Sequence, residues 1–443
     1  MIRTGEQYRQ SLRDGRDVRL DGQRVADVAA HPVFKPLVDT RARLYDLQHA
    51  PASRDVLSFD DGVERHAIGN KLPLTKQDWW DKRRAMDALM QAAGGWAARL
   101  GSESAGEMWS LFDGQDVLND MDPAYRANLR AHIHHVLHED PFLVCADSDQ
   151  AKAPLHVVRD TDAGLVVRGV ARDTAAAYAD RAFVRPGAAW QAQRAPAARA
   201  VGFVCDLGAP GVGLHCSARG AARQDGEPSV LARHLDEVPT DIVFDDALIP
   251  WEQVLFYRHA GAVEFVRATQ SRYSGFSRLQ RGLALADMLA GAALLAARLA
   301  GTEAQAQGAL VRLAAYREAI HAHLTAAITL AEPSPAGLMM PNQSLLHAGL
   351  ALAGAGLGET AAAARALCAA LHEPAHAAPQ QAAGPGRLLA YARDVLDSRY
   401  LAELAAAGAP PCDGLAPCQH ALQAHFDWGR PLAVAAGAAG MAV

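Results

Sequence analysis

The segment DIVFDDALIPWEQVL, residues 241–255, decides the predicted fold. A run of β-branched and aromatic residues leads into Asp245 and Asp246, and a second short apolar run ends at Pro250 and Trp251. Because proline cannot donate to a β-ladder, we expect Pro250 at the edge or the exit of a strand. The large indole of Trp251 suits a seam between two layers. The segment therefore predicts the end of a β region and the start of a helical one.

Upstream of this segment, short extended runs alternate with glycine, proline and aspartate from Pro141 onwards. Such a pattern is typical of a barrel or a sandwich. The strands that it predicts are 155–158, 165–170, 182–185, 200–205, 211–215 and 240–244. We therefore expect a central β domain over residues 139–258.

The first 138 residues are predicted to be mostly helical. Thr4 and Gln7 have the spacing of a capping arrangement at the start of a helix. Two Asp-Gly turns around residues 18–20 indicate a small hairpin. The helices that apolar periodicity predicts here are about 4–20, 41–49, 79–100 and 123–137.

Downstream of residue 258 the chain is rich in alanine and helical in pattern, which predicts a bundle over residues 259–443. The expected helices are 261–301, 303–331, 341–371 and 386–407, with breaks at 332–335 and 373–386 and a loosely ordered tail at 408–443. The most apolar window, 283–300, contains Asp287 and Arg298. We expect it to be a buried core helix rather than a membrane span.

Composition narrows the class of protein. A chain of 443 residues is too long for one compact core, so two or three domains are expected. The net charge is −6 and no block of lysine and arginine stands out, which argues against a nucleic acid as the main partner. Six scattered cysteines and the lack of a secretory signal predict a cytoplasmic protein with reduced thiols.

The order of a helical, a β and a bundle region resembles that of the acyl-CoA-dehydrogenase-like flavoproteins, an α+β class. Motifs narrow the resemblance to the 4-hydroxyphenylacetate 3-monooxygenase large-component family. Those resembling its opening are TGEQY at 4–8, SLRDGR at 11–16, DGQRV at 21–25, HPVF at 31–34 and RLYDLQH at 43–49. Those resembling its β domain are AGLVVRG at 163–169, TAAAYAD at 174–180 and the segment 245–254. The bundle is similar only in character.

This resemblance implies a reduced-flavin (FADH₂)-dependent monooxygenase, the oxygenase component of a two-component system. A separate flavin reductase would supply the FADH₂. Reaction with O₂ would give a flavin C4a-hydroperoxide, which transfers one oxygen to a small aromatic or amine-bearing substrate. The protein would hold the flavin, exclude water and orient the substrate. The family is usually a homotetramer, so a homodimer or a homotetramer is expected.

The resemblance also assigns three residues to the catalytic site. GGWAAR at 94–99 matches the segment that ends in the family's substrate-binding arginine, which makes Arg99 the counterpart. Glu103 stands where the family has a tyrosine, and Cys145 stands where it has a histidine. Because a thiol with a pKa of about 8.5 is less fitted than histidine to take a phenolic proton, an amine-bearing or non-phenolic substrate is an alternative.

Five further residues are assigned to the flavin. Ser148, Asp149 and Gln150 match polar contacts of the family, and Thr174 matches a threonine near the edge of the flavin ring. His156 is a further candidate, with a structural role in a strand as its alternative. Without the resemblance, Thr174 would be an ordinary turn residue and Arg99 a solvated helix-end arginine.

Other functions remain open at this stage. One is a different flavin reaction on the same fold, dehydrogenation or N-oxygenation, and another is a non-catalytic binding subunit. The histidine group His132, His134, His135 and His138 resembles a metal site, and a solvated helix face is the preferred interpretation, so no metal is expected. The three cysteines and one histidine that a related branch, the 4-hydroxybutyryl-CoA dehydratases, needs for its cluster cannot be placed in this sequence.

Overall fold

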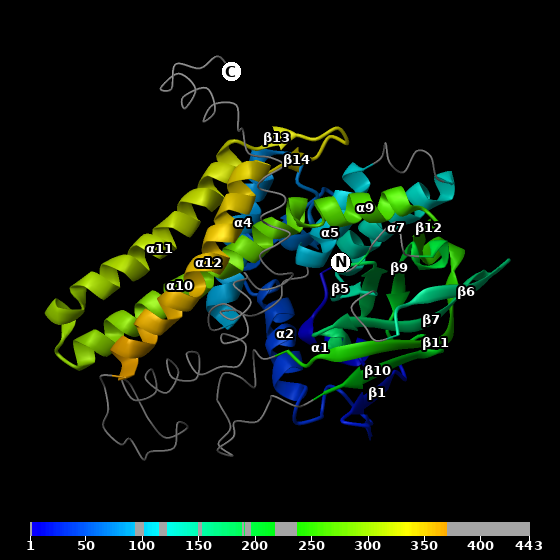
Figure 1. Ribbon diagram of the computed structural model, residues 1–443, viewed down its shortest axis with the longest axis horizontal. Coiled ribbons are helices and arrows are strands. Elements are labelled where there is room, and N and C mark those ends of the chain that lie inside the picture. Colours follow the sequence, from blue (N-terminus) through cyan, green and yellow to red (C-terminus); the bar gives the residue numbers. More distant parts are fainter. Residues whose placement is uncertain are drawn as a thin grey trace.

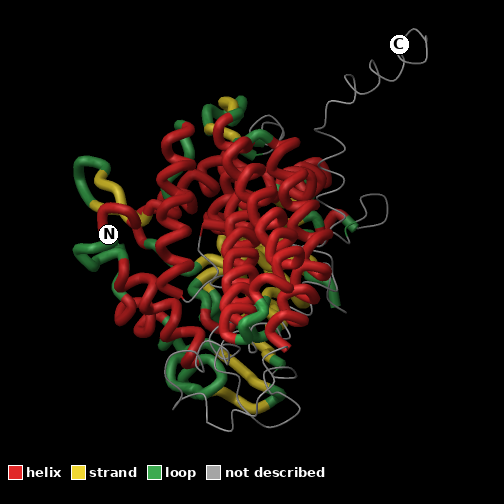
Figure 2. The backbone as a smooth tube through the Cα atoms, turned by 90° about the vertical axis from the view of Figure 1, so that its left-hand side faces the viewer, coloured by secondary structure: helices red, strands yellow, loops and turns green. Residues whose placement is uncertain are grey.

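The computed structural model of the chain describes residues 2–93, 102–114, 122–148, 153–187, 190, 196–217 and 237–369. A large β-sheet lies on one side of the molecule and a bundle of long helices on the other, with α4 (Lys76–Ala93) and α5 (Ser102–Asp113) between them (Figure 1). Viewed from the bundle, the long helices cover the sheet (Figure 2). This arrangement confirms the predicted α+β class.

The central sheet has ten strands among the described residues. They are β1 (Asp17–Leu20), β2 (Gln23–Val25), β5 (Leu143–Asp147), β6 (His156–Thr161), β7 (Gly164–Asp173), β8 (Arg181–Arg185), β9 (Val201–Asp206), β10 (Val212–Cys216), β11 (Thr240–Pro250) and β12 (Val254–Tyr257). Their order is β12-β9-β8-β5-β7-β11-β10-β1-β2, and β6 pairs with β7. The pairs β1–β10 and β5–β8 are parallel. Strand β5 was not predicted from the sequence. The hairpin predicted near residue 20 is confirmed as β1–β2, and it forms part of this sheet.

The segment that decides the fold ends the β region as predicted. Strand β11 is longer than the expected 240–244 because the chain continues through a bulge between Phe244 and Ala247, where Asp246 has a φ of +50°. The strand ends at Pro250. The indole N–H of the next residue, Trp251, donates to the carbonyl of Thr161 at 2.9 Å and so ties the exit of β11 to β6.

The first helix, α1 (Gly5–Ser11), begins with the predicted capping box. The backbone N–H of Gln7 donates to the Thr4 hydroxyl at 3.2 Å, and the Gln7 side chain accepts from the Thr4 N–H at 2.8 Å. The helix is shorter than the expected 4–20, because the chain turns at Gly15, where φ is +86°. The remaining elements before β5 are α2 (Lys35–Leu47), α3 (Arg54–Leu57), β3 (Ser58–Asp60), β4 (Arg65–Ala67), η1 (Ile68–Asn70) and α7 (Pro123–Glu139).

The bundle consists of long helices that pack on one another (Figure 1). They are α9 (Ala260–Thr269), α10 (Ser271–Leu299), α11 (Glu303–Thr329) and α12 (Gln343–Ala369), with the small hairpin β13–β14 (Glu332–Pro333, Met339–Met340) after α11. The predicted helix 261–301 is therefore two helices that meet at Gln270. The predicted helix 386–407 and the tail 408–443 lie outside the described residues.

One helical run in the described part of the chain, Ala260–Arg298, is long and apolar enough to cross a membrane. Its most apolar window is 56% buried inside the protein, and the side chains of Leu289 and Ala293 are completely buried. This burial is what a core helix of the bundle requires, and it agrees with the expectation for residues 283–300.

Strands β5 and β8 stand between two apolar cores because their side chains alternate. Val144 and Val184 point into the core of the β domain. Leu143, Cys145 and Phe183 point the other way and pack with residues of α5, α9 and α10. The sheet and the bundle thus share a seam formed by β5, β8, α5 and α10.

Candidate active site

Helix α5 turns two carboxylates towards α10. Glu103 and Glu107 are four residues apart, so they lie on one face of the helix, and both are buried. Arg278 and Arg281 are three residues apart on α10 and are also buried. The contact between these two helices therefore places two negative and two positive side chains at the seam.

Glu107 is the centre of a buried ionic network. Its Oε2 accepts from Nε and Nη2 of Arg185, on β8, at 2.9 and 2.8 Å. Its Oε1 accepts from Nη2 of Arg278 at 3.0 Å. Asp147, on β5, also pairs with Arg185. Because a buried charge is costly unless it is paired, this network holds β5, β8, α5 and α10 in one arrangement.

Glu103 has its own cationic partner in α10. Its Oε1 lies 2.7 Å from Nε of Arg281, an ion pair whose atoms are not aligned for a hydrogen bond. Glu103 is 7% exposed and Arg281 is 3% exposed. The predicted site carboxylate is therefore neutralised by an arginine that the sequence did not single out.

Cys145 reaches the same seam from β5. Its Sγ lies 3.9 Å from the carbonyl oxygen of Ser104, the residue next to Glu103. Burial raises the pKa of the Cys145 thiol well above its usual value, and the negative charge of Glu107 adds to the effect. The structure thus places Cys145 against α5 beside the residue that follows Glu103, and it keeps the thiol protonated at neutral pH.

The predicted flavin contacts are spread over the ends of three strands. Ser148 follows β5, and its backbone N–H donates to the carbonyl of Arg185 at 3.0 Å. Thr174 follows β7, and its hydroxyl donates to the Glu237 carboxylate. His156 begins β6, with Nδ1 3.3 Å from the carbonyl of Pro154. Arg99, Asp149 and Gln150 lie outside the described residues.

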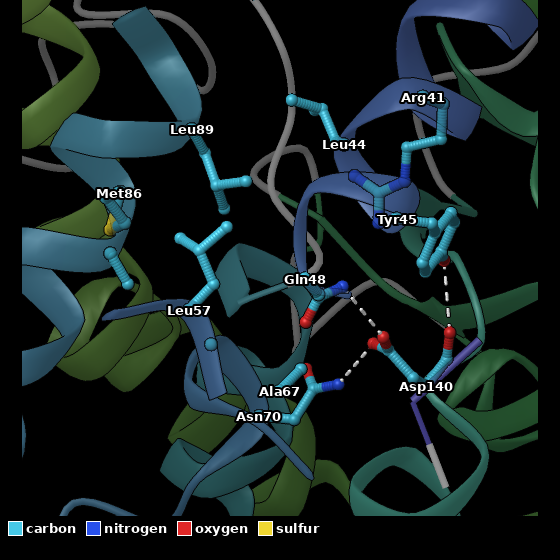
Figure 3. Close-up of a pocket in the computed structure, with 12 residues that line it drawn as sticks. Arg41, Leu44, Tyr45, Gln48, Leu57, Ala67, Asn70, Met86, Leu89 and Asp140 are labelled. Atoms are coloured by element: carbon cyan, nitrogen blue, oxygen red, sulfur yellow. Dashed lines mark hydrogen bonds between the residues drawn. The ribbon is translucent and has the colours of Figure 1, made fainter. Parts of the chain in front are cut away.

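A pocket away from this seam lies between α2, α4 and η1 (Figure 3). At its polar end the Asp140 carboxylate accepts from Gln48 at 3.3 Å and from Asn70 at 2.7 Å. Burial raises the pKa of Asp140 to about 6. The apolar side chains that line the opposite end are Leu44, Leu57, Met86 and Leu89. None of the described site residues that the sequence predicted lines this pocket.

Sequence reasoning missed Glu107, Arg185 and Arg278, which join the seam. No helix was predicted over residues 102–113, so the four-residue spacing of Glu103 and Glu107, which was a signal for the first, was not recognised. Arg185 is the last residue of β8, and because it lies two residues after Phe183, the alternation of the strand places both side chains on the same face. Arg278 had no signal, because the apolar pattern of α10 does not show which turns face the sheet.

A sheet domain packed against a helical bundle across such a seam defines the acyl-CoA-dehydrogenase-like class of fold. Within this class, the chain belongs to the 4-hydroxyphenylacetate 3-hydroxylase family. The model of that family's N-terminal part matches residues 4–256, and the model of its C-terminal part matches residues 260–374. The family that the sequence motifs predicted is confirmed.

Three known proteins illustrate this membership. The FADH(2)-dependent monooxygenase TftD of Burkholderia cepacia is 28% identical over 79% of this chain and 71% of its own length. The pyoverdin chromophore biosynthetic protein PvcC of Pseudomonas aeruginosa is 31% identical over 78% of this chain and 72% of its own. The crystal structure of the HpaB oxygenase component complexed with FAD and 4-hydroxyphenylacetate superposes with a TM-score of 0.82, covers 99% of each chain at 21% identity, and so shares the fold.

Proposed function

We propose that this protein is an FADH₂-dependent monooxygenase, the oxygenase component of a two-component system, which acts on a small aromatic substrate. The observation that carries the proposal is the family match, which continues from residue 4 to residue 374 apart from three residues. Relatives matched over 71% and 74% of their own length are named as an FADH(2)-dependent monooxygenase and as the oxygenase component of 4-hydroxyphenylacetate 3-monooxygenase. The same fold holds FAD and 4-hydroxyphenylacetate in HpaB.

Two described residues, Trp190 and Thr174, have polar groups that could bind a flavin. Trp190 is 4% exposed, and its indole N–H has no hydrogen-bond partner among the described residues, so it is a buried donor suited to a flavin carbonyl. The Thr174 hydroxyl donates to Glu237, and a hydroxyl is also an acceptor, which is the role that a contact with a flavin N–H would need. When bound, reduced FAD supplies the electrons that activate O₂ for transfer of one oxygen atom.

The residues of the chain would then position the reactants and keep water out. The network around Glu107 fixes the helix and strands that line the seam, and the apolar side chains Phe183 and Phe276 close it. We propose Ser148, Asp149, Gln150 and Thr174 as the flavin-binding set and Arg99 as the substrate-binding cation, following the family match. His156 remains the weakest member of this set, because its strand lies beyond β7 from β5.

For Cys145 and Glu103 the geometry favours roles other than proton transfer. A protonated thiol cannot act as a proton acceptor, so we propose that Cys145 shapes the pocket. Glu103 would bind a substrate amine only by giving up Arg281. We therefore favour an aromatic substrate without a required amine, and the proton of a phenolic substrate would be taken by another group or by water.

The remaining features of the system follow from the same proposal. A separate flavin reductase supplies FADH₂, the protein is a cytoplasmic homodimer or homotetramer, and three structural units divide the chain at residues 138 and 258. Strands β1 and β2 belong to the central sheet, so the N-terminal unit contributes to the β domain and the two units do not fold independently.

A flavin titration coupled to oxygen uptake tests this function. The purified protein is mixed with FADH₂ under anaerobic conditions, and binding is followed by flavin fluorescence. Oxygen uptake is then measured with a flavin reductase, NADH and a panel of phenols. Binding of FADH₂ together with substrate-dependent hydroxylation supports the proposal. A protein that binds neither FAD nor FADH₂ would be a non-catalytic member of the family.

A further inference from the structure

A second group of ionisable side chains lies where the hairpin β3–β4 packs on the end of α7. Glu64 and His66 come from the hairpin and His138 from the last turn of α7, and one ligand atom of each lies within 4.8 Å of the others. The Glu64 Oε1 lies 2.5 Å from His138 Nδ1 and 4.0 Å from His66 Nε2. Among the described residues, these three side chains form a group whose potential ligand atoms are close enough to hold one metal ion.

The hydrogen bonds of His66 provide an independent argument. Its side chain is fully buried, and its Nδ1 lies 3.2 Å from the carbonyl oxygen of Leu137. Its Nε2 lies 2.8 Å from Oδ2 of Asp61. Both partners are acceptors, whereas a neutral imidazole has one N–H. Two states of the ring fit these contacts: an imidazolium that donates to both acceptors, or a neutral ring that donates from Nδ1 to Leu137 and offers its Nε2 lone pair to a cation held beside the carboxylates. The second state has the orientation of a metal-ligating histidine.

The surroundings favour a positive charge at this point. Two carboxylates face the two imidazoles: Oδ2 of Asp61 lies 2.8 Å from Nε2 of His66, and Oε1 of Glu64 lies 2.5 Å from Nδ1 of His138. The carbonyl end of a helix carries partial negative charge, and α7 ends at Glu139, directly after His138. A cation here would neutralise the carboxylates and the helix end together.

His134 and His138 are four residues apart on α7 and their rings stack, but these two rings are not the proposed ligand pair. Their centroids are 3.9 Å apart, which confirms that the residues face together. His132 is buried elsewhere, and burial lowers its pKa to about 4. The partners of His138 come instead from the hairpin, about 70 residues upstream, which is why the group could not be assembled from spacing along α7.

We propose that Glu64, His66 and His138 form a binding site for a divalent transition-metal ion of the zinc type, completed by water. Two imidazole nitrogens and one carboxylate oxygen are a ligand set suited to such an ion. Neighbouring ligand atoms around a tetrahedral zinc ion are about 3.3 Å apart, given bonds of about 2.0 Å. The separations of 2.5 and 4.0 Å lie on either side of that value, so side-chain shifts of about one ångström complete the site.

The ion would join the hairpin to the end of α7. The chain leaves α7 through the buried Asp140, which accepts from Asn70 of η1 at 2.7 Å, and enters β5, the strand that carries Cys145. A metal bridge would therefore fix the connection through which α7 positions one wall of the seam. The inference does not depend on the reaction at that seam.

Zinc binding by the whole protein tests the site. Protein dialysed against a chelator is titrated with ZnCl₂ by calorimetry, and Co²⁺ is added in parallel because its visible absorption reports tetrahedral nitrogen and oxygen ligands. We expect one equivalent of zinc, and a rise in melting temperature on zinc addition. The variants Glu64→Gln and His138→Gln, both at partly exposed positions, should each weaken zinc binding at least tenfold.

The control is His215→Gln, which removes an exposed histidine of β10 and should leave zinc affinity unchanged. Melting of each variant without zinc checks that it is folded, so the test does not need a substitution of the buried His66. The proposal is overturned if the protein binds no zinc, or if Glu64→Gln and His138→Gln bind it as tightly as the unaltered protein. The group would then consist of hydrogen-bonded acid–imidazole pairs only.

Discussion

The two halves of α10 differ more than any sequence periodicity suggests. The first half, which contacts α5, buries apolar side chains such as Tyr273, Phe276 and Leu279, and beside them it buries many polar and charged ones: Ser271, Ser274, Ser277, Arg278, Gln280 and Arg281. The second half, facing α11 and α12, buries leucines and alanines: Leu285, Leu289, Ala293 and Ala296. Buried charges contribute less to stability than apolar packing of the same volume. We therefore infer that the polar side chains of the first half serve function, and that the apolar side chains of the second half serve the stability of the fold.

The largest effect is expected at the polar half, from Glu107→Gln. The substitution leaves Arg185 and Arg278 without the carboxylate that joins them, and loss of one partner of a buried ion pair costs about 4 kcal/mol. Urea unfolding should show this loss, and oxygenation at temperatures where the variant is folded should fall by more than tenfold.

The matched control for this variant is Glu264→Gln, which breaks an exposed ion pair with Arg267 on α9. It should change stability by less than about 1 kcal/mol. Equal effects of the two substitutions would mean that the Glu107 network is no more important than a surface pair.

A substitution in the apolar second half of α10 should lower the stability of the protein without changing its activity. Leu289 is fully buried, and Leu289→Ala should lower the free energy of unfolding by about 3 kcal/mol through the lost contacts and the cavity. The kcat of the folded variant should stay within about twofold of the original, because Leu289 lies in the core between α10, α11 and α12. Val311→Ala, at a position 60% exposed on α11, is the control for truncation. A large loss of kcat in Leu289→Ala would remove the distinction between the halves.

The smallest effect is expected from Cys145→Ser. If the thiol only shapes the pocket, a hydroxyl of similar size should change kcat by no more than about threefold, whereas loss of a proton-transfer group costs about a hundredfold or more. Steady-state rates across pH 6 to 9 would distinguish the two roles. A drop of the larger size, with a pH profile that loses one ionisation, would show that Cys145 exchanges protons after all.

Much of the fold was predictable because it depends on local signals. The exit of β11 follows from Pro250, and the start of α1 follows from Thr4 and Gln7, whereas the bulge that lengthens β11 was not predicted. Site residues that meet across the seam were less predictable. Glu103 was named but its partner Arg281 was not, since pairing between α5 and α10 depends on how two distant helices pack.

The proposed metal site of Glu64, His66 and His138 could not be predicted from spacing along the chain either. The histidines of α7 were visible in the sequence, but a hairpin brings Glu64 and His66 to His138 through tertiary packing. Family motifs, in contrast, carry information on distant contacts indirectly, and they led to the correct class of protein where spacing along the chain could not.

The most direct test of the central claim is the origin of oxygen in the product. The protein is incubated with a flavin reductase, NADH, FAD, a phenolic substrate and ¹⁸O₂, and the product is analysed by mass spectrometry. An FADH₂-dependent monooxygenase should place one labelled oxygen atom in each product molecule, and omission of the reductase should abolish the product. A product that has lost two hydrogens and carries no label would contradict the account.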